Sequence, residues 1–161
     1  MRLLTIFIFL TVSAVGQQIK LVDVAWIEQM KANQSDTIYV INFWATWCKP
    51  CVAELPVFEK LGAEYAGSNV KVLLVSTDMR KELNARLKSF VYEKQLKQQV
   101  LLMNEVNADK WINQVNTDWS GAIPATWVIR GKTGFANFVE GEMNEEELRA
   151  ILEKAKHNNI K

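Results

Sequence analysis

Short apolar runs alternate along the chain with segments in which apolar residues recur every three or four positions. The runs are rich in β-branched and aromatic residues, as buried strands are, whereas the other spacing predicts amphipathic helices. Strands that alternate with helices and end in a hairpin predict an α/β domain, with a central mixed β-sheet flanked by helices on both faces. The predicted strands are 37–43, 69–77, 99–103, 121–130 and 135–140, and the predicted helices are 24–31, 52–65, 80–93, 108–115 and a last one after position 144.

Individual residues refine these boundaries. Pro56 removes a backbone donor within 52–65, so we expect it to interrupt and kink that helix. Asp78 stands just before 80–93 and is expected to cap the start of that helix. Asn144 and Glu147 have the spacing of a capping box, which predicts where the last helix begins.

The first sixteen residues differ from the rest of the chain. Met1 and Arg2 supply positive charge, an almost unbroken apolar run follows, and small residues lead up to Gly16. This order is typical of a secretory signal peptide, and the run is short for a membrane span, which needs about 20 residues. We therefore predict a signal peptide at 1–16, a domain at 17–161 and export to the periplasm, with an uncleaved N-terminal anchor as the alternative.

Length and charge narrow the function classes. The chain has 161 residues, 49% of them hydrophobic and 23% charged, which suits one globular domain. Its formal net charge of +1 gives no electrostatic basis for binding nucleic acid or an anionic membrane surface. We therefore expect no nucleic-acid partner.

The two cysteines of the chain, Cys48 and Cys51, stand between a predicted strand and a predicted helix. A helix N-terminus favours a thiolate through its free backbone N–H groups and its dipole. Residues three apart on a helical turn lie about 5–6 Å apart, which is within reach of a disulfide. So short a loop removes little entropy from the unfolded chain. The spacing therefore favours redox exchange over a permanently closed structural disulfide.

The run from Asn42 to Cys51, together with Glu54, Pro56 and the pair Ile123–Pro124, resembles the thioredoxin superfamily. The resemblance is strongest to its exported TlpA/ResA-like thiol-disulfide oxidoreductases and covers about residues 18–156. It implies a thioredoxin-like fold and an enzyme that exchanges disulfides with exported proteins. Cytosolic thioredoxins differ in having a buried aspartate where this chain has Asn42.

Roles for the residues beside the cysteines follow from their positions. Cys48 is the expected nucleophile because the first cysteine of such a helix start is the more exposed, and Cys51 is the expected resolving thiol. Lys49 adds positive potential beside Cys48, and Pro50 suits the first helical turn. The alternative for Lys49 is an ordinary solvated lysine.

The resemblance implies a role for Glu54 and for the pair Ile123–Pro124, and the place of Trp47 next to Cys48 indicates a third role. Glu54, one helical turn after Cys51, is expected to move protons during exchange, although an exposed glutamate would be equally ordinary there. The pair Ile123–Pro124 is expected to form a cis-proline element that packs against the dithiol and pairs with an extended substrate segment. Trp47 is expected to line the substrate surface. Two other tryptophans, Trp44 and Trp127, are expected in the core.

Rival chemistries lack their residues. Zinc needs about four ligands, and the one histidine of the chain, His157, lies in a polar tail. Covalent haem attachment needs a histidine where Val52 follows Cys51. We therefore expect no metal and no cofactor. A thioredoxin-fold binding or chaperone-like module stays open as the non-enzymatic alternative.

The direction of exchange is the remaining question. DsbA-like oxidants carry a histidine between the cysteines, whereas this chain has Lys49 and Pro50, which favours a reductant. The expected partners are disulfide-containing protein substrates, with apocytochrome c suggested by the resemblance, and a membrane or exported thiol protein that exchanges electrons with the dithiol. A disulfide-forming oxidant is the alternative.

Overall fold

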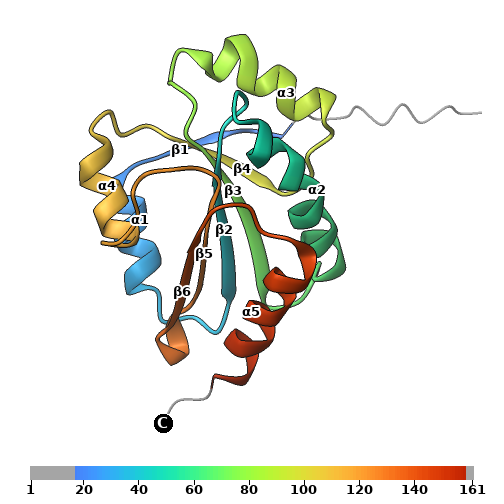
Figure 1. Cartoon of the computed structure of the whole chain (residues 1–161), viewed down its shortest axis with the longest axis vertical. Coiled ribbons are helices and arrows are strands. Elements are labelled where there is room, and N and C mark those ends of the chain that lie inside the picture. The colour runs from blue at the N-terminus through green and yellow to red at the C-terminus, as the bar shows by residue number, and fades with distance from the viewer. Residues whose placement is uncertain (1–16, 159–161) are drawn as a thin grey trace, which may run out of the picture.

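A computed structural model describes residues 17–158 of the chain. Six strands form one sheet in the order β1-β4-β3-β2-β5-β6, as Figure 1 shows. Strands β1, β4, β3 and β2 are parallel to one another, whereas β5 is antiparallel to both of its neighbours, β2 and β6, so the sheet is mixed as predicted. The strands are β1 (Lys20–Val22), β2 (Ile38–Trp44), β3 (Val70–Ser76), β4 (Gln99–Met103), β5 (Ala125–Arg130) and β6 (Phe135–Glu140).

Helices cover both faces of the sheet, which confirms the predicted fold class. One core lies between the sheet and the helices α2, α3 and α5, and the other lies between the sheet and the helices α1 and α4. Side chains of β2 alternate between these cores: Val40 and Trp44 face α2, whereas Ile41 and Phe43 face the opposite side. The helices are α1 (Val24–Ala32), α2 (Lys49–Glu64), α3 (Lys88–Glu93), α4 (Ala108–Val115) and α5 (Glu145–His157).

Helix α2 runs through Pro56 without interruption, so the predicted break is wrong. A proline in a helix removes one backbone hydrogen bond. The turns beyond Pro56 bury Phe58 and Leu61 against the sheet, at 0% and 1% exposure. Burying two large apolar side chains contributes about 3–6 kcal/mol, which offsets a cost of about 3 kcal/mol for the proline.

Asp78 does not cap a helix, which corrects a second expectation. The first helical element after β3 is a π-helical turn, η1 (Leu83–Leu87), and its N-cap residue is Glu82, which makes no side-chain cap bond. The Asp78 carboxylate instead points into the protein, where it is 2% exposed and accepts hydrogen bonds from Thr46 and Ser76. Three buried donors satisfy this carboxylate better than an exposed helix start could.

The ends of the domain differ in how well they were predicted. Asn144 and Glu147 form the expected capping box at the start of α5. Strand β1 was not expected, because its three residues are ordered by pairing with β4 some eighty positions later. The predicted signal peptide at 1–16 lies outside the described residues, as do the last three residues. Within the described part, no helix is both long and apolar enough to cross a membrane.

Candidate active site

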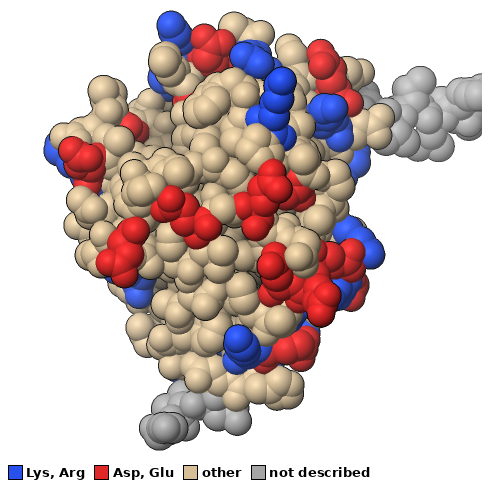
Figure 2. Space-filling view, in the orientation of Figure 1, with Lys and Arg blue, Asp and Glu red and all other residues tan. Residues whose placement is uncertain are grey.

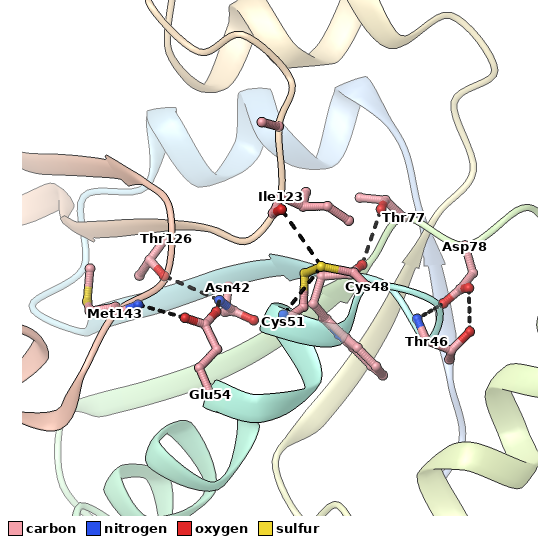
Figure 3. Close-up of a disulfide and its surroundings, with 12 residues drawn as sticks. Asn42, Thr46, Cys48, Cys51, Glu54, Thr77, Asp78, Ile123, Thr126 and Met143 are labelled. Atoms are coloured by element: carbon pink, nitrogen blue, oxygen red, sulfur yellow. Dashed lines mark hydrogen bonds between the residues drawn. A yellow bond between two sulfur atoms is a disulfide. The ribbon is translucent and has the colours of Figure 1, made fainter.

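Cys48 and Cys51 form a disulfide at the N-terminus of α2, directly after the carboxyl end of β2 (Figure 3). A tight turn connects the two elements, and the backbone N–H of Cys48 donates to the carbonyl of Ala45 at 3.1 Å. Cys48 is the N-cap residue of α2, and the two Cα atoms are 5.3 Å apart, as the spacing predicted. The sequence therefore folds into a helix start at which this bond opens and closes without rebuilding the backbone.

The two sulfurs have different surroundings. Cys51 is completely buried, whereas Cys48 is 5% exposed, so the outer sulfur belongs to Cys48. The backbone N–H of Cys51 points at the Cys48 Sγ from 3.3 Å. Together with the helix dipole, this donor stabilises negative charge on Cys48 more than on Cys51.

The segment before β5 packs against the dithiol. The bond between Ile123 and Pro124 is cis, as the resemblance implied, and Pro124 is buried. The Ile123 carbonyl oxygen lies 3.7 Å from the Cys48 Sγ. A disulfide sulfur has no proton to donate, so this contact becomes a hydrogen bond only when Cys48 carries a thiol. Ile123 and Pro124 thus lie where a segment bound to Cys48 would pass.

An apolar groove leads away from Cys48. Its volume is about 560 Å³, and Trp47 and Ile123 form its wall next to the dithiol. Trp47 is 60% exposed, and Lys49 and Pro50 are exposed beside it. Trp44 and Trp127 are buried in the core, as expected. The remaining wall comes from the segment after β3, from the end of β4 with the segment and helix α4 that follow it, and from Gly121. It combines apolar side chains, such as Met79, Val106 and Trp111, with charged ones, such as Arg80 and Glu105.

Glu54 lies beneath the dithiol on the buried side of α2, at 5% exposure. Its Oε1 accepts a hydrogen bond from the Asn42 side-chain Nδ2 at 2.7 Å, and its Oε2 accepts one from the backbone N–H of Met143 at 2.8 Å. Burial raises the pKa of Glu54 to about 7, and the two hydrogen bonds only partly oppose that increase. At neutral pH this carboxyl can therefore both hold and release a proton.

A second buried carboxylate holds the turn before Cys48. Asp78 accepts from the Thr46 backbone N–H at 3.0 Å and from the Thr46 hydroxyl at 2.7 Å. The neighbouring Thr77 backbone N–H donates to the Trp44 carbonyl at 2.7 Å. The end of β3 is thereby fastened to the turn that presents Trp47 and Cys48.

The structure brings together every site residue that was predicted from the sequence. It adds Met143, Thr126 and the Asp78–Thr46 pair, which sequence reasoning missed, and it shows that Asn42, singled out in the motif, contacts Glu54. Two signals were available: a polar Asn42 within an apolar buried strand, and an acidic residue directly after β3. Among residues 17–158, no three His, Cys, Asp or Glu side chains cluster closely enough to hold a metal ion.

Known proteins resemble the chain in sequence. The model of the AhpC/TSA family matches residues 14–134. A thiol-disulfide oxidoreductase named ResA from Bacillus cereus is 30% identical over 114 residues, which is 71% of this chain and 61% of the relative. The thioredoxin-like protein YneN of Bacillus subtilis is also 30% identical, over 71% of this chain and 62% of its own length. The match thus spans about three fifths of each relative.

The fold also has solved counterparts. The crystal structure of a thioredoxin-related protein from Neisseria meningitidis serogroup B superposes with a TM-score of 0.65. It is 21% identical, and the superposition covers 78% of this chain and 89% of that protein. At this identity the likeness establishes the fold alone, which is thioredoxin-like.

Proposed function

The chain belongs to the AhpC/TSA family, and from that premise we propose that it is a thiol-disulfide oxidoreductase that reduces disulfides of exported proteins through Cys48 and Cys51. The observation that carries the proposal is the placement of the pair. A disulfide closes a helix N-terminus, with its outer sulfur next to an exposed tryptophan, a groove and the Ile123 carbonyl. The ResA relatives, described as thiol-disulfide oxidoreductases, support the same activity.

The reaction begins with the reduced enzyme. The Cys48 thiolate attacks one sulfur of the substrate disulfide, which forms a mixed disulfide and releases the first substrate thiolate. Cys51 then loses its proton, and its thiolate attacks the Cys48 sulfur. The Cys48–Cys51 disulfide forms, the second substrate thiolate leaves, and two electrons have passed from the dithiol to the substrate. The released thiolates take up protons from Glu54 or from water.

Glu54 is the proposed acceptor of the Cys51 proton. Cys51 is completely buried, so water does not reach its thiol, and Glu54 lies three residues later on the same side of α2. A pKa near 7 suits a group that must take a proton and release it again at neutral pH. Asn42 has no titratable group and cannot take this proton. Glu54 is the buried acid that lies on the same helix as Cys51.

The direction, the partners and the location form the remainder of the proposal. Lys49 and Pro50 occupy the positions between the cysteines, with no histidine to destabilise the disulfide, which favours a reductant. Electrons would come from a thiol protein of the membrane or the exported compartment. A dithiol in an oxidising compartment needs a dedicated source of electrons to stay reduced. Apocytochrome c is one proposed substrate, and the periplasm is the proposed location.

The test of the activity is reduction of insulin disulfides by dithiothreitol, with and without the protein. We expect acceleration by the wild type and none by Cys48→Ser. Cys51→Ser should accumulate a mixed disulfide on Cys48, which mass spectrometry of the intact protein detects, because the resolving thiol is missing. A wild-type protein that leaves the insulin rate unchanged while its disulfide is reducible would support the binding-module alternative instead.

A further inference from the structure

Asn42 is a polar residue inside an otherwise apolar strand, and its side chain is completely buried. It faces α2 with Val40 and Trp44 because side chains alternate along β2. Its Nδ2 donates to Glu54 Oε1 at 2.7 Å and lies 3.3 Å from the Thr126 hydroxyl. In Figure 3 the Asn42 side chain lies between the Glu54 carboxyl group and Cys51.

The other end of this amide has no partner. Asn42 Oδ1 is buried and accepts no hydrogen bond from any described residue. An unsatisfied buried acceptor costs about 1–3 kcal/mol, so native proteins rarely keep one without a reason. In the oxidised form the neighbouring Cys51 carries no proton and has nothing to donate.

The hydrogen-bond donors around Glu54, with the Asn42 amide as it now points, match the ionised state of the carboxyl group. Both carboxyl oxygens face N–H donors, from Asn42 and from Met143, which matches a carboxylate. A protonated Glu54 would point its O–H at the Asn42 NH₂, placing donor against donor. The negative charge of Glu142 also acts on Glu54 and further favours the protonated form.

We propose that Asn42 is a positioning residue that turns its amide by half a rotation when Glu54 gains or loses a proton. With Glu54 ionised, Nδ2 donates to the carboxylate and Oδ1 faces the Cys51 thiol. With Glu54 protonated, Oδ1 accepts the carboxyl O–H and Nδ2 faces the Cys51 sulfur. The Thr126 hydroxyl serves both orientations, because a hydroxyl can accept from Nδ2 or donate to Oδ1.

This device rests on the proposed function and would assist its resolving step. When the Cys51 proton moves to Glu54, the turned amide donates to the thiolate that has just formed. The same rotation receives the new carboxyl proton on Oδ1. A single uncharged side chain thus forms a hydrogen bond with the proton donor and with the proton acceptor. A carboxylate at position 42 would instead have to share a proton with Glu54, because two neighbouring carboxylates repel each other.

Nuclear magnetic resonance of the oxidised wild-type protein tests the rotation directly. The disulfide cysteines do not titrate in that form, so Glu54 can be followed by its side-chain carboxyl ¹³C resonance between pH 4 and 9. We expect the Asn42 side-chain NH₂ resonances to shift with the same midpoint. Their nuclear Overhauser contacts should move from Thr126 at high pH to the Cys51 Hβ protons at low pH, and Glu54→Gln should abolish the midpoint.

Two results would overturn the proposal: Asn42 contacts that stay constant across the Glu54 midpoint, or no Glu54 midpoint in that pH range. Neither result depends on activity, so the proposed function can fail or succeed separately.

A kinetic measurement adds the functional consequence. A chromophoric thiol loaded on Cys48 is released when Cys51 attacks, and its release rate can be followed against pH. We expect Asn42→Leu to slow release at pH 7 by about tenfold or more and to shift the pH profile, because the thiolate and Glu54 lose a hydrogen-bond partner.

The matched control is Asn137→Leu, which removes the amide of the other asparagine whose Oδ1 is buried without a described partner. It should leave the rate of thiol release within about twofold of the wild-type rate at each pH. A twofold change in rate corresponds to less than about 0.5 kcal/mol in activation free energy. Equal effects of the two substitutions would mean that Asn42 is merely structural.

Discussion

At the scale of single residues, the site combines a pair of cysteines with a buried acid, Glu54, whose pKa is raised to about 7. The outer sulfur is stabilised by a helix start, and the inner sulfur is buried with Glu54 on the same side of α2. The carboxyl group is ionised only at a cost, since burial disfavours its charged form. The same cost lowers the stability of the folded protein when Glu54 is ionised.

The stability of the protein should therefore depend on the charge of Glu54. Its folded pKa of about 7 lies above the ordinary value of 4.5, so the folded state binds the proton more tightly than the unfolded state. This difference in proton binding adds about 3 kcal/mol to the free energy of unfolding below pH 4.5. The added stability is lost as pH rises through about 7.

Urea unfolding at pH 5 and pH 8.5 measures this effect as the difference between the wild type and Glu54→Gln. We expect the wild type to lose about 2–3 kcal/mol relative to the variant between these two pH values. A difference that stays constant with pH would show that Glu54 is ionised normally in the folded protein.

At the scale of elements, the end of β3 and the turn before α2 act together. Asp78 holds the buried Thr46 through two hydrogen bonds, and Thr77 holds the carbonyl of Trp44. These bonds restrain the turn Ala45–Trp47 from one side, while the first turn of α2 fixes it from the other. The orientation of the exposed Trp47 follows from both.

Removing the Asp78 carboxylate should destabilise the fold. Asp78→Ala leaves the Thr46 backbone N–H buried without an acceptor and is expected to lower the free energy of unfolding by about 2–4 kcal/mol. Asp78→Asn keeps an oxygen for that N–H and should cost less than half as much. Chemical denaturation followed by tryptophan fluorescence compares the two, and equal losses would mean that the hydrogen bond to Thr46 is not the cause.

The sequence predicted most elements because their signals are local. The run of β-branched and aromatic residues in β2, the apolar spacing of α2 and the capping box of α5 each lie within a few neighbouring residues. The failures required distant partners. Asp78 stands where a helix cap would be expected, yet two of the three groups that donate to its carboxylate belong to Thr46, thirty-two positions earlier. Strand β1 is too short to be recognised without β4 beside it.

In the candidate site, too, the motif residues were predicted from the sequence but their distant contacts were not. Both cysteines and Trp47 were predicted from their positions in the chain, and Glu54 and the pair Ile123–Pro124 from the family resemblance. The partners of Glu54 were not, because Asn42 and Met143 reach it from a central strand and from the loop before α5. A sequence shows that a residue is polar within an apolar strand, but only the fold shows what it contacts.

At the scale of the whole molecule, the fold sets how a partner can approach. The dithiol lies beyond the carboxyl end of β2, beside the groove that the segments after β3 and β4 enclose. Such crevices at strand ends are the usual binding sites of sheets with parallel strands. A polypeptide that reaches Cys48 would therefore meet apolar surface on the groove side, and exposed Lys49 on the helix side.

Charge is unevenly distributed over this shape despite a net charge of +1. Figure 2 shows Lys and Arg side chains most numerous at the end that carries α3, and Asp and Glu across the middle of the same face. Residues 80–97, which include η1 and α3, contain six basic residues and two acidic ones. The local charge at that end is therefore positive, and its field weakens as salt is added.

The central claim is that the Cys48–Cys51 pair serves as a reductant, and its reduction potential tests this most directly. Equilibration of the protein with glutathione buffers, followed by quantification of the reduced fraction, gives that potential. We predict a value closer to that of thioredoxin, about −270 mV, than to that of DsbA, about −120 mV. A value above about −180 mV, the potential of protein disulfide isomerase, would contradict the reductant assignment.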